Sequence, residues 1–336
     1  MIAITGVCGL TGANLARLLL GQGRQVRGLI HREKRAVEGL DIELAQADIR
    51  DPSSLRRALA GVEVVYHLAA RISLGTKDLA ETEATNVQGA RNVVEACLHC
   101  GVRRLVHFSS IHALEQAPLG LPLDESRPTV SSQNRSPYDR SKALGELEAL
   151  QGLSRGLEVV ILNPTAMIGP YDYYPSYMGK ALLSLAQGRI PALVRGGFDW
   201  VDVRDVVQAA IQAEQRAESG TSYILSGHWR SVRQIADLTA ELTGKGAPLF
   251  TVPTGLAYLA APLMAGLARF NNTQPIYTRL TLDALNSNRQ ISHARASRDL
   301  GYQPRPLKNT VQDTLDWFAQ NGYLRGADHF RKARHD

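Results

Sequence analysis

The chain opens with Met1-Ile2-Ala3-Ile4, an apolar run that leads directly into Thr5-Gly6-Val7-Cys8-Gly9-Leu10-Thr11-Gly12. In residues 13–20, leucines recur near the helical period, which predicts a helix. A buried strand, a glycine-rich turn and a helix N-terminus together make the phosphate-binding turn of dinucleotide-binding folds. These first residues therefore predict both the start of such a fold and its cofactor site.

Each glycine of this turn has its own expected role. Gly6 permits the tight turn, Gly9 lets the backbone approach a pyrophosphate, and Gly12 lets the helix pack closely on the strand. The free N–H groups and the positive end of the helix dipole then face the phosphates. Because glycine triplets also occur in surface turns, the motif gains its weight from lying between a strand and a helix.

Strands and helices alternate through the first half of the chain. We expect strands at residues 26–30, 43–47, 62–70, 105–110 and 159–162, and long helices at 85–100 and from Tyr138 onward. Asp51 and Pro52 have the residue types of a helix N-cap and first helical position. This alternation predicts an α/β fold with a doubly wound parallel sheet, the Rossmann fold.

Beyond Pro164 the pattern loosens. We expect strands at 198–203 and 223–226, the second returning to the sheet, and helices at 231–244, 255–270, 278–285 and 307–320. The predicted division is a dinucleotide-binding domain at 1–165, to which 200–226 returns. A smaller, mostly helical substrate lobe takes 166–199 and 227–325, and 326–336 form a basic tail.

Composition is that of a soluble globular protein, with 44% hydrophobic and 21% charged residues among 336. The net charge of +6 comes from scattered cations without interleaved aromatic residues, so we expect no nucleic-acid partner. The three cysteines, Cys8, Cys97 and Cys100, are an odd number without a leader peptide, which favours the reducing cytoplasm. The last two form a C-x-x-C without a second pair, so no metal site is expected.

Two features bear on membranes. The N-terminus enters the first strand directly, which predicts no signal peptide. The apolar stretch 255–270 contains Pro262 and is too short to span a bilayer, so we expect no integral membrane segment. It would lie on a membrane surface or cap an apolar pocket.

The end of the second strand favours NADP. NAD-binding folds place an Asp or Glu there for the ribose hydroxyls. This chain has His31-Arg32-Glu33-Lys34-Arg35, in which cations surround the single acid. Such a segment suits a 2′-phosphate and predicts NADP, with NAD as the alternative.

Tyr138 and Lys142 lie four residues apart, on one face of the expected helix. A nearby ammonium, helped by a cofactor ribose, is expected to lower the pKa of the phenol, so that Tyr138 exchanges a proton with a carbonyl or alcohol. Ser110 ends the fifth strand, where ligands of open α/β sheets bind, and can hydrogen-bond the substrate oxygen. His112 follows two residues later and either touches substrate or is a loop histidine without a catalytic role.

The chain resembles the extended short-chain dehydrogenase/reductases, the NAD-dependent epimerase/dehydratase superfamily, over nearly its whole length. The resemblance rests on the glycine turn, Asp48-Ile49, His67-Leu68-Ala69-Ala70, Asn86, Ser109-Ser110, Pro137-Tyr138-Asp139-Arg140-Ser141-Lys142, Asn163-Pro164, Trp200-Val201-Asp202-Val203-Arg204-Asp205-Val206 and Leu300-Gly301-Tyr302-Gln303-Pro304.

The resemblance implies a catalytic set of Ser110, Tyr138 and Lys142, with Tyr138 as the acid/base and Lys142 on the nicotinamide ribose. Together with the basic residues after the second strand, the predicted cofactor contacts are Gly6, Gly9, Leu10, Thr11, Gly12, His31, Arg32, Asp48, Ile49, Leu68, Ala69, Ala70, Asn86, Tyr138, Lys142, Asn163 and Pro164. It also implies a homodimer built from the helices around 86–100 and 138–155, which carry additional apolar positions such as Val93, Leu147 and Leu150.

Three functions remain open within this resemblance. Dehydratases of sugar nucleotides have an Asp-Glu pair where Ile111-His112 stands, which argues against dehydration. Epimerases hold the diphosphate with an Arg where this chain has Phe198. The tail Ser287-Asn288-Arg289-Gln290-Ile291-Ser292 is similar to dihydroflavonol 4-reductase-like and 3β-hydroxysteroid dehydrogenase-like members. We therefore expect an NADP-dependent oxidoreductase that interconverts a ketone and a secondary alcohol on an apolar or aromatic small molecule. An NDP-sugar epimerase is the alternative, followed by a non-catalytic NAD(P)-sensing protein.

Overall fold

A seven-stranded parallel sheet lies at the centre of the larger part of the computed structural model, which describes residues 1–72, 78–131, 135–259 and 279–324. Its order is β10-β6-β5-β4-β1-β2-β3, and every neighbouring pair is parallel. The strands are β1 (Ile2–Thr5), β2 (Val26–Ile30), β3 (Glu43–Gln46), β4 (Val64–His67), β5 (Arg104–Phe108), β6 (Glu158–Pro164) and β10 (Ser222–Leu225). The predicted doubly wound sheet is confirmed.

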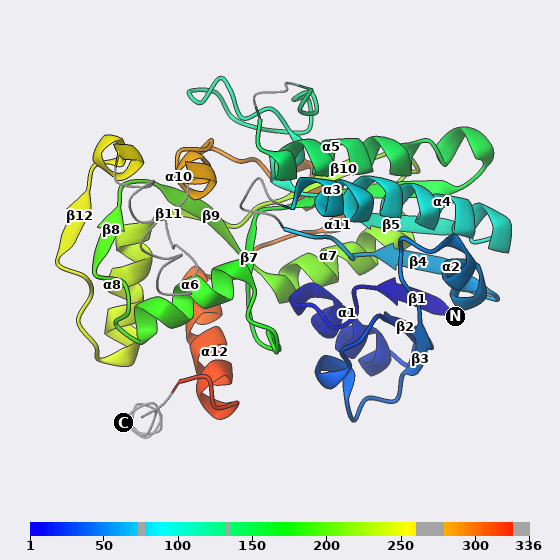
Figure 1. The fold of residues 1–336 in the computed structure, drawn as a ribbon, viewed down its shortest axis with the longest axis horizontal. Helices are drawn as coiled ribbons and strands as arrows, with labels where there is room; N and C mark the ends of the chain where they lie inside the picture. The colour runs from blue at the N-terminus through cyan, green and yellow to red at the C-terminus, as the bar shows by residue number, and fades with distance from the viewer. Residues whose placement is uncertain (73–77, 132–134, 260–278, 325–336) are drawn as a thin grey trace.

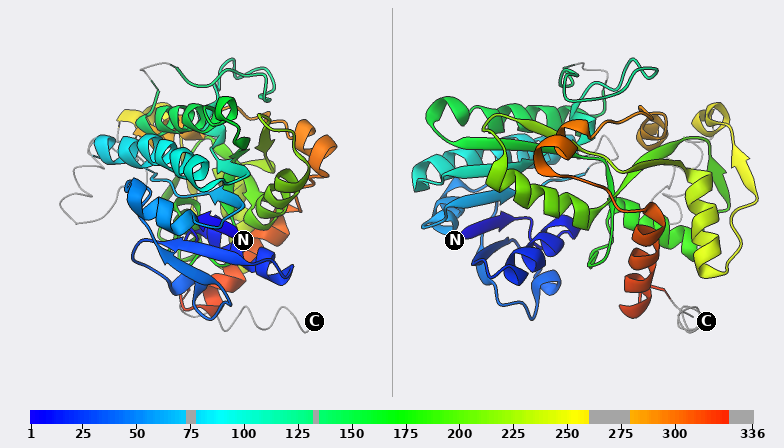
Figure 2. Two further views of the ribbon diagram at one scale, coloured as in Figure 1. Left: turned by 90° about the vertical axis from the view of Figure 1, so that its right-hand side faces the viewer. Right: turned by 180° about the vertical axis from the view of Figure 1, so that it is seen from behind.

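Helices cover both faces of this sheet (Figures 1 and 2). One face packs on α1 (Leu10–Gly21), α7 (Val203–Arg216) and α11 (Ala294–Leu300), and its core includes Leu15, Val206 and Leu300. The other packs on α2 (Pro52–Leu59), α4 (Gly89–Cys100) and α5 (Pro137–Leu150). The α2 helix begins as predicted, because the Asp51 carboxylate accepts from the backbone N–H groups of Ser53 and Ser54.

A smaller lobe lies beyond the carboxyl ends of the strands (Figure 1). It contains the helices α6 (Tyr177–Ala186), α8 (Val232–Thr243), α10 (Arg279–Leu285) and α12 (Leu307–Gln320). Two small sheets join them: β11-β9-β7, made of β7 (Ala166–Ile168), β9 (Gly197–Asp202) and β11 (His228–Ser231), and the pair β8 (Ala192–Val194) and β12 (Phe250–Val252). A separate core around Leu182, Trp200 and Phe318 holds the lobe together.

Several expected boundaries differ from the structure. The strand predicted at 62–70 ends at His67, because the backbone N–H groups of Leu68 and Ala69 turn to the Thr5 hydroxyl instead of continuing the sheet ladder. The helix predicted at 85–100 begins earlier, as α3 (Leu79–Glu83), and passes through a π-helical turn at Ala84–Gln88 into α4.

Two segments also pack in a different part of the fold from the one that the sequence predicted. Residues 200–202 pair within the small sheet as part of β9, although 200–226 were expected to return to the main sheet. Helix α11 packs on the main sheet, although it lies within the stretch assigned to the lobe. Hydrophobic periodicity identifies an element but not the sheet that it joins, which explains both differences.

Most of the apolar stretch at 255–270 lies outside the described residues. Its described part, residues 255–259, belongs to a helical segment that begins at residue 254. None of the helices within the described ranges has the length and apolarity needed to cross a bilayer.

Candidate active site

The glycine turn has the geometry that its sequence predicts. Gly6 has a φ of +69°, and a Cβ there would lie 2.8 Å from the Ala69 backbone nitrogen. A Cβ on Gly12 would lie 2.4 Å from the Gly6 carbonyl oxygen. Gly9, in contrast, is exposed, and its Cβ would approach only that same oxygen, at 3.4 Å. Two glycines are therefore needed for backbone packing, while the third leaves the turn open to a ligand.

The N-terminus of α1 fits a dinucleotide phosphate. Gly9 is its N-cap, so no side chain caps the helix, and its first turn holds no acidic residue. The N–H groups at this end therefore remain available to an anion. Thr11 and Leu10, which were predicted to contact the cofactor, line the cavity that begins here.

Charges beyond β2 favour an anion as well. The Tyr174 hydroxyl donates to the Glu33 carboxylate at 2.7 Å, so the only acid of residues 31–35 is already hydrogen-bonded. Arg32 and Lys34 are exposed and have no ion-pair partner among the described residues. His31 lies 3.5 Å from Asp48.

The Asp48 carboxylate is already hydrogen-bonded by another residue of the protein. Its carboxylate accepts from the Arg50 guanidinium at 2.6 Å, and this hydrogen bond lowers the pKa of Asp48 to about 2. Ile49 is buried and touches the position of a Cβ on Gly89, so it packs α4 against the turn. Contacts of Asp48 and Ile49 with an adenine stay predictions.

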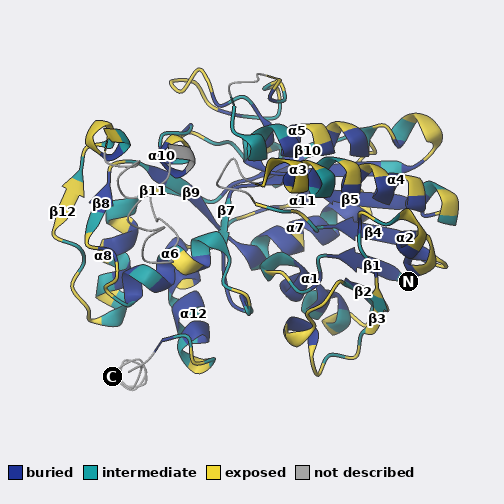
Figure 3. Ribbon diagram, viewed as in Figure 1, coloured by how far each residue is buried: buried dark blue, intermediate teal, exposed yellow. Residues whose placement is uncertain are grey.

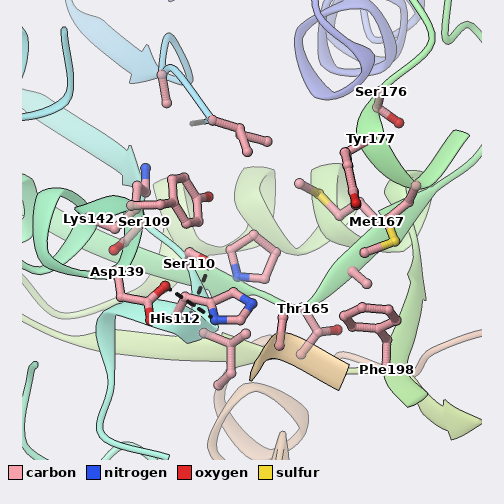
Figure 4. Close-up of a pocket in the computed structure, with 18 of the residues that line it drawn as sticks. Ser109, Ser110, His112, Asp139, Lys142, Thr165, Met167, Ser176, Tyr177 and Phe198 are labelled. Atoms are coloured by element: carbon pink, nitrogen blue, oxygen red, sulfur yellow. Dashed lines mark hydrogen bonds and ion pairs between the residues drawn. The ribbon is translucent and has the colours of Figure 1, made fainter. Parts of the chain in front are cut away.

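Ser110, Tyr138 and Lys142 line one cavity of about 320 Å³, at the carboxyl ends of β5 and β6 (Figure 4). Ser110 follows β5, whereas the other two lie on the first turns of α5. Proline at the first position of α5 and the Ser136 hydroxyl, which accepts from the Asp139 N–H, fix where this helix starts. The same cavity reaches Leu68, Ala70 and Pro164.

Burial controls the protonation of the predicted acid/base pair. It raises the pKa of Tyr138 to about 12, against a smaller opposing effect of the Ser110 hydroxyl. It also lowers the pKa of Lys142 to about 8, against the opposing carboxylate of Glu146. The protein without a cofactor therefore raises the pKa of Tyr138, whereas the sequence predicted a lowered pKa. The Lys142 ammonium instead donates to the Phe108 carbonyl oxygen at 2.7 Å.

Lys142 lies near a group of buried polar side chains that includes His67 and His107. The Thr5 hydroxyl and His67 Nδ1 are 2.7 Å apart, and the His67 and His107 ring centroids are separated by 5.2 Å. Burial lowers the pKa of both imidazoles, to about 3 for His67. His67 is thus a hydrogen-bonded histidine of the core.

Two side chains predicted to contact the cofactor, Asn86 and Asn163, form hydrogen bonds within the protein. The Asn86 side chain hydrogen-bonds both the N–H and the carbonyl of Arg71 and donates to the Ser141 hydroxyl. The Asn163 amide donates to the Ser110 carbonyl and to the Glu146 carboxylate, at 3.1 and 3.0 Å. Both side chains are buried, so direct contacts with a cofactor stay predictions.

His112 faces the cavity beside Tyr138. Its backbone N–H donates to the Ser110 hydroxyl, and its Nδ1 lies 3.6 Å from the Asp139 carboxylate (Figure 4). The His112 and Tyr138 ring centroids are 6.2 Å apart. Of the two roles left open for His112, this position favours contact with substrate.

The far wall of the cavity is mostly apolar. Met167 of β7, Tyr177 of α6 and Phe198 of β9 point into it (Figure 4). Among the described residues no arginine lines the cavity. Arg195, three residues before Phe198, is exposed, and its backbone pairs with Val252 of β12.

Sequence reasoning did not identify Glu146, Asp139 or Met167 as site residues. Glu146 had a detectable signal, because it continues the four-residue spacing of Tyr138 and Lys142 on the same helix face. Asp139 lies next to Tyr138, but only the folded chain brings His112 to it. Met167 reaches the cavity through the pairing of β7 with β9, which no local pattern encodes.

The expectation that the cysteines form no metal site stays a prediction. All three cysteines are free thiols, and Cys97 is buried. No cluster of metal-binding side chains occurs in the ranges that the structure describes.

Comparison with known protein families shows which family this chain belongs to. The profile of the NAD-dependent epimerase/dehydratase family matches residues 2–225. The chain belongs to this family. As a member of the epimerase/dehydratase family, the chain is an enzyme of the NAD(P)-dependent dehydrogenases, reductases and epimerases.

Its relatives include oxidoreductases. Sterol demethylase protein B of Methylococcus capsulatus is 36% identical, over 96% of this chain and 99% of the relative. A putative dihydroflavonol 4-reductase of Synechocystis is 32% identical, over 96% and 95%. A 3beta-hydroxysteroid-dehydrogenase/decarboxylase of Arabidopsis thaliana is 29% identical, over 84% and 68%.

Solved structures of the family share the fold. The crystal structure of gox2253 has a TM-score of 0.85 and 32% identity, and covers 97% of this chain and 99% of its own. A nucleoside-diphosphate-sugar epimerase from Pseudomonas aeruginosa has a TM-score of 0.79 and 24% identity, over 96% and 99%. At that identity the second likeness extends to the fold alone.

Proposed function

We propose that this family member is an NADP-dependent oxidoreductase that interconverts a ketone and a secondary alcohol on an apolar or aromatic small molecule. The observation that carries the proposal is the cavity in front of Ser110 and Tyr138, which has apolar walls and no arginine among the described residues. The names of its relatives support the same substrate class, since they include a dihydroflavonol reductase and a hydroxysteroid dehydrogenase.

The cofactor would be held by the glycine turn and the residues after β2. Gly9 and the uncapped N-terminus of α1 suit its diphosphate, and Arg32 and Lys34 suit a 2′-phosphate. When bound, the nicotinamide supplies or accepts a hydride at the substrate carbon.

Tyr138 would exchange the accompanying proton. With a pKa of about 12 the phenol is protonated at neutral pH, and it donates a proton to the carbonyl oxygen in the direction of reduction. The Ser110 hydroxyl hydrogen-bonds the same oxygen. Lys142, buried and fixed on the Phe108 carbonyl, would bind the ribose and stabilise the phenolate that remains.

Replacing Tyr138 with Phe tests this assignment. The change keeps the ring and removes the exchangeable proton, so NADPH oxidation with flat apolar ketones should fall by about a hundred- to ten-thousandfold. Cofactor affinity should stay nearly unchanged. Tyr66→Phe, which removes a buried hydroxyl from the core, is the matched control and should retain activity.

Near-normal turnover by the Tyr138→Phe variant would overturn the catalytic role. A wild-type protein that binds NADPH but reduces none of a broad ketone panel would instead support a cofactor sensor.

Binding of nucleoside diphosphates separates the proposal from an NDP-sugar epimerase. Phe198 stands where epimerases have the diphosphate-binding Arg, and loss of such a charge-assisted contact costs about 2–3 kcal/mol, or roughly a hundredfold in affinity. Calorimetry with UDP, dTDP and their sugars should therefore detect weak binding or none. Micromolar binding of any of them would favour the epimerase.

A further inference from the structure

A buried carboxylate lies next to the candidate active site. It belongs to Glu146 of α5, a helix along which Figure 3 shows exposed residues as well as buried ones. The Glu146 side chain is only 3% exposed, and it forms no direct ion pair within the part of the chain that the structure describes. Because a buried charge is costly unless other groups compensate it, the surroundings of this carboxylate indicate its role.

The Glu146 carboxylate is held from the sheet. Asn163, at the end of β6, donates from Nδ2 to Glu146 Oε2 at 3.0 Å and to the Ser110 carbonyl oxygen at 3.1 Å. A backbone carbonyl and an ionised carboxylate can only accept hydrogen bonds, so both N–H bonds of the amide are used. The carboxylate therefore has a fixed orientation between α5 and the strand end.

The side chain one helical turn before Glu146 is Lys142. The two residues share a face of α5, and Lys142 is buried as well. Its ammonium donates to the Phe108 carbonyl oxygen, which is a neutral acceptor. Burial lowers the pKa of Lys142 to about 8, and the Glu146 carboxylate opposes that effect because a nearby negative charge favours the ammonium.

Other titratable groups around Lys142 do not supply this negative charge. His67 of β4 and His107 of β5 are buried, and burial lowers the pKa of both, so they are neutral. The Tyr138 phenol, with a pKa of about 12, is neutral too, and Asp139 acts on that phenol. The carboxylate one turn further along α5 is therefore the negative charge that acts on Lys142.

We propose that Glu146 is a positioning residue that keeps Lys142 protonated, with Asn163 holding its carboxylate in place. Glu146 acts through Lys142 and does not need to touch substrate or cofactor. The consequence for turnover rests on the proposed function, in which the ammonium stabilises the Tyr138 phenolate. The charge on Lys142 can be measured separately, without any ligand.

The test is an NMR titration of the full-length protein without cofactor. The ε-carbon resonances of isotope-labelled lysines report the charge on each ammonium, and Lys142→Arg identifies the Lys142 resonance by its absence. In the wild type Lys142 should titrate near pH 8. Glu146→Gln keeps an oxygen acceptor for Asn163 and removes the negative charge. The ammonium should then lose its proton at a pH lower by about one unit or more.

Glu148→Gln is the matched control. Glu148 is a second buried carboxylate of α5, but it pairs with Arg91 at 2.6 Å, so its loss should leave the Lys142 midpoint unchanged. Glu146→Asp retains the charge and should restore most of the shift that Glu146→Gln causes.

The alkaline fall of kcat/KM for ketone reduction should move to lower pH in Glu146→Gln by the same amount as the Lys142 midpoint. A protein that reduces no ketone would defeat the proposed function, whereas the titration would still decide the role of Glu146. The positioning role is overturned if Lys142 of the wild type is already uncharged at pH 7, a result that needs no variant. It is also overturned if the Gln variants of Glu146 and Glu148 shift the midpoint equally or not at all.

Discussion

Single polar residues determine much of the chemistry beneath this site. His67 and His107 are neighbours on β4 and β5, and both are fully enclosed under α5 beside Lys142. Their burial keeps them uncharged, which leaves Lys142 as the cation closest to Tyr138 in this layer. We therefore expect these buried imidazoles to affect the charge beside Tyr138 without contacting the substrate.

Acid should destabilise the protein through His67. Its pKa is about 3 when folded and about 6.5 when unfolded, so the unfolded state takes up the proton first as the pH falls. Between those values each pH unit costs about 1.4 kcal/mol of the free energy of unfolding. His67→Gln should remove this contribution, so that the stability advantage of the wild type narrows from pH 7 to pH 5 in urea unfolding.

The comparison of wild type and variant isolates His67 from other titrating groups. Asp172, for example, has its pKa raised to about 6 by burial, which works in the opposite direction in both proteins. A stability difference that does not change with pH would contradict the prediction.

Cofactor preference should depend on Arg32. We expect tighter binding of NADPH than of NADH, and Arg32→Ala should weaken NADPH about tenfold while leaving NADH nearly unchanged, because only NADPH carries the 2′-phosphate. Arg216→Ala, at the exposed end of α7, is the control for general charge loss. Fluorescence titration with both cofactors measures the effect, and equal or tighter NADH binding by the wild type would contradict the NADP assignment.

Among the elements, the turn between β1 and α1 tolerates the least change. Gly12→Ala would put a Cβ 2.4 Å from the Gly6 carbonyl and 2.6 Å from the Val7 Cα, both backbone atoms that have little room to move. We expect a loss of about 1–3 kcal/mol in stability, as for other overpacked sites, together with weakened cofactor binding.

Gly21→Ala provides the matched control in the same helix. Nothing lies within 4 Å of its added Cβ, and alanine suits a helix better than glycine by about 0.5–1 kcal/mol. Thermal unfolding should therefore move in opposite directions for the two variants. If both glycines tolerate alanine equally, the close packing of α1 on the turn is not what stabilises this element.

On the scale of the whole molecule, the exposed leucines of α5 bear on whether two copies associate. Val93, one of the apolar residues expected there, is buried in the protein's own core and cannot contribute. Leu144 and Leu147 of α5 remain 43% and 46% exposed. We propose a homodimer through these helices, as the family resemblance implies.

Leu147→Glu should shift the protein from dimer to monomer at micromolar concentration. A carboxylate buried between two copies loses its hydration, whereas on the free monomer it stays in water and leaves the fold intact. Light scattering measures the mass, and circular dichroism confirms the fold. A monomeric wild type would contradict the proposed interface.

The sequence by itself determined the parallel, doubly wound sheet and the placement of Tyr138 and Lys142 on one helix face. These features are local: a glycine turn needs particular φ angles and close approach, and Tyr138 and Lys142 share a face because a helix has a fixed period. Even the N-cap at Asp51 follows from neighbouring residues.

Only the tertiary structure decided which distant residues meet. Periodicity did not assign β9 to the small sheet or α11 to the large one, because both pack through contacts far apart in the chain. The pairing of His112 with Asp139 and the apolar wall around Phe198 likewise bring together residues from separate elements. Burial in the folded chain raises the pKa of Tyr138. Local sequence specifies the elements, and desolvation by the folded chain sets their chemistry.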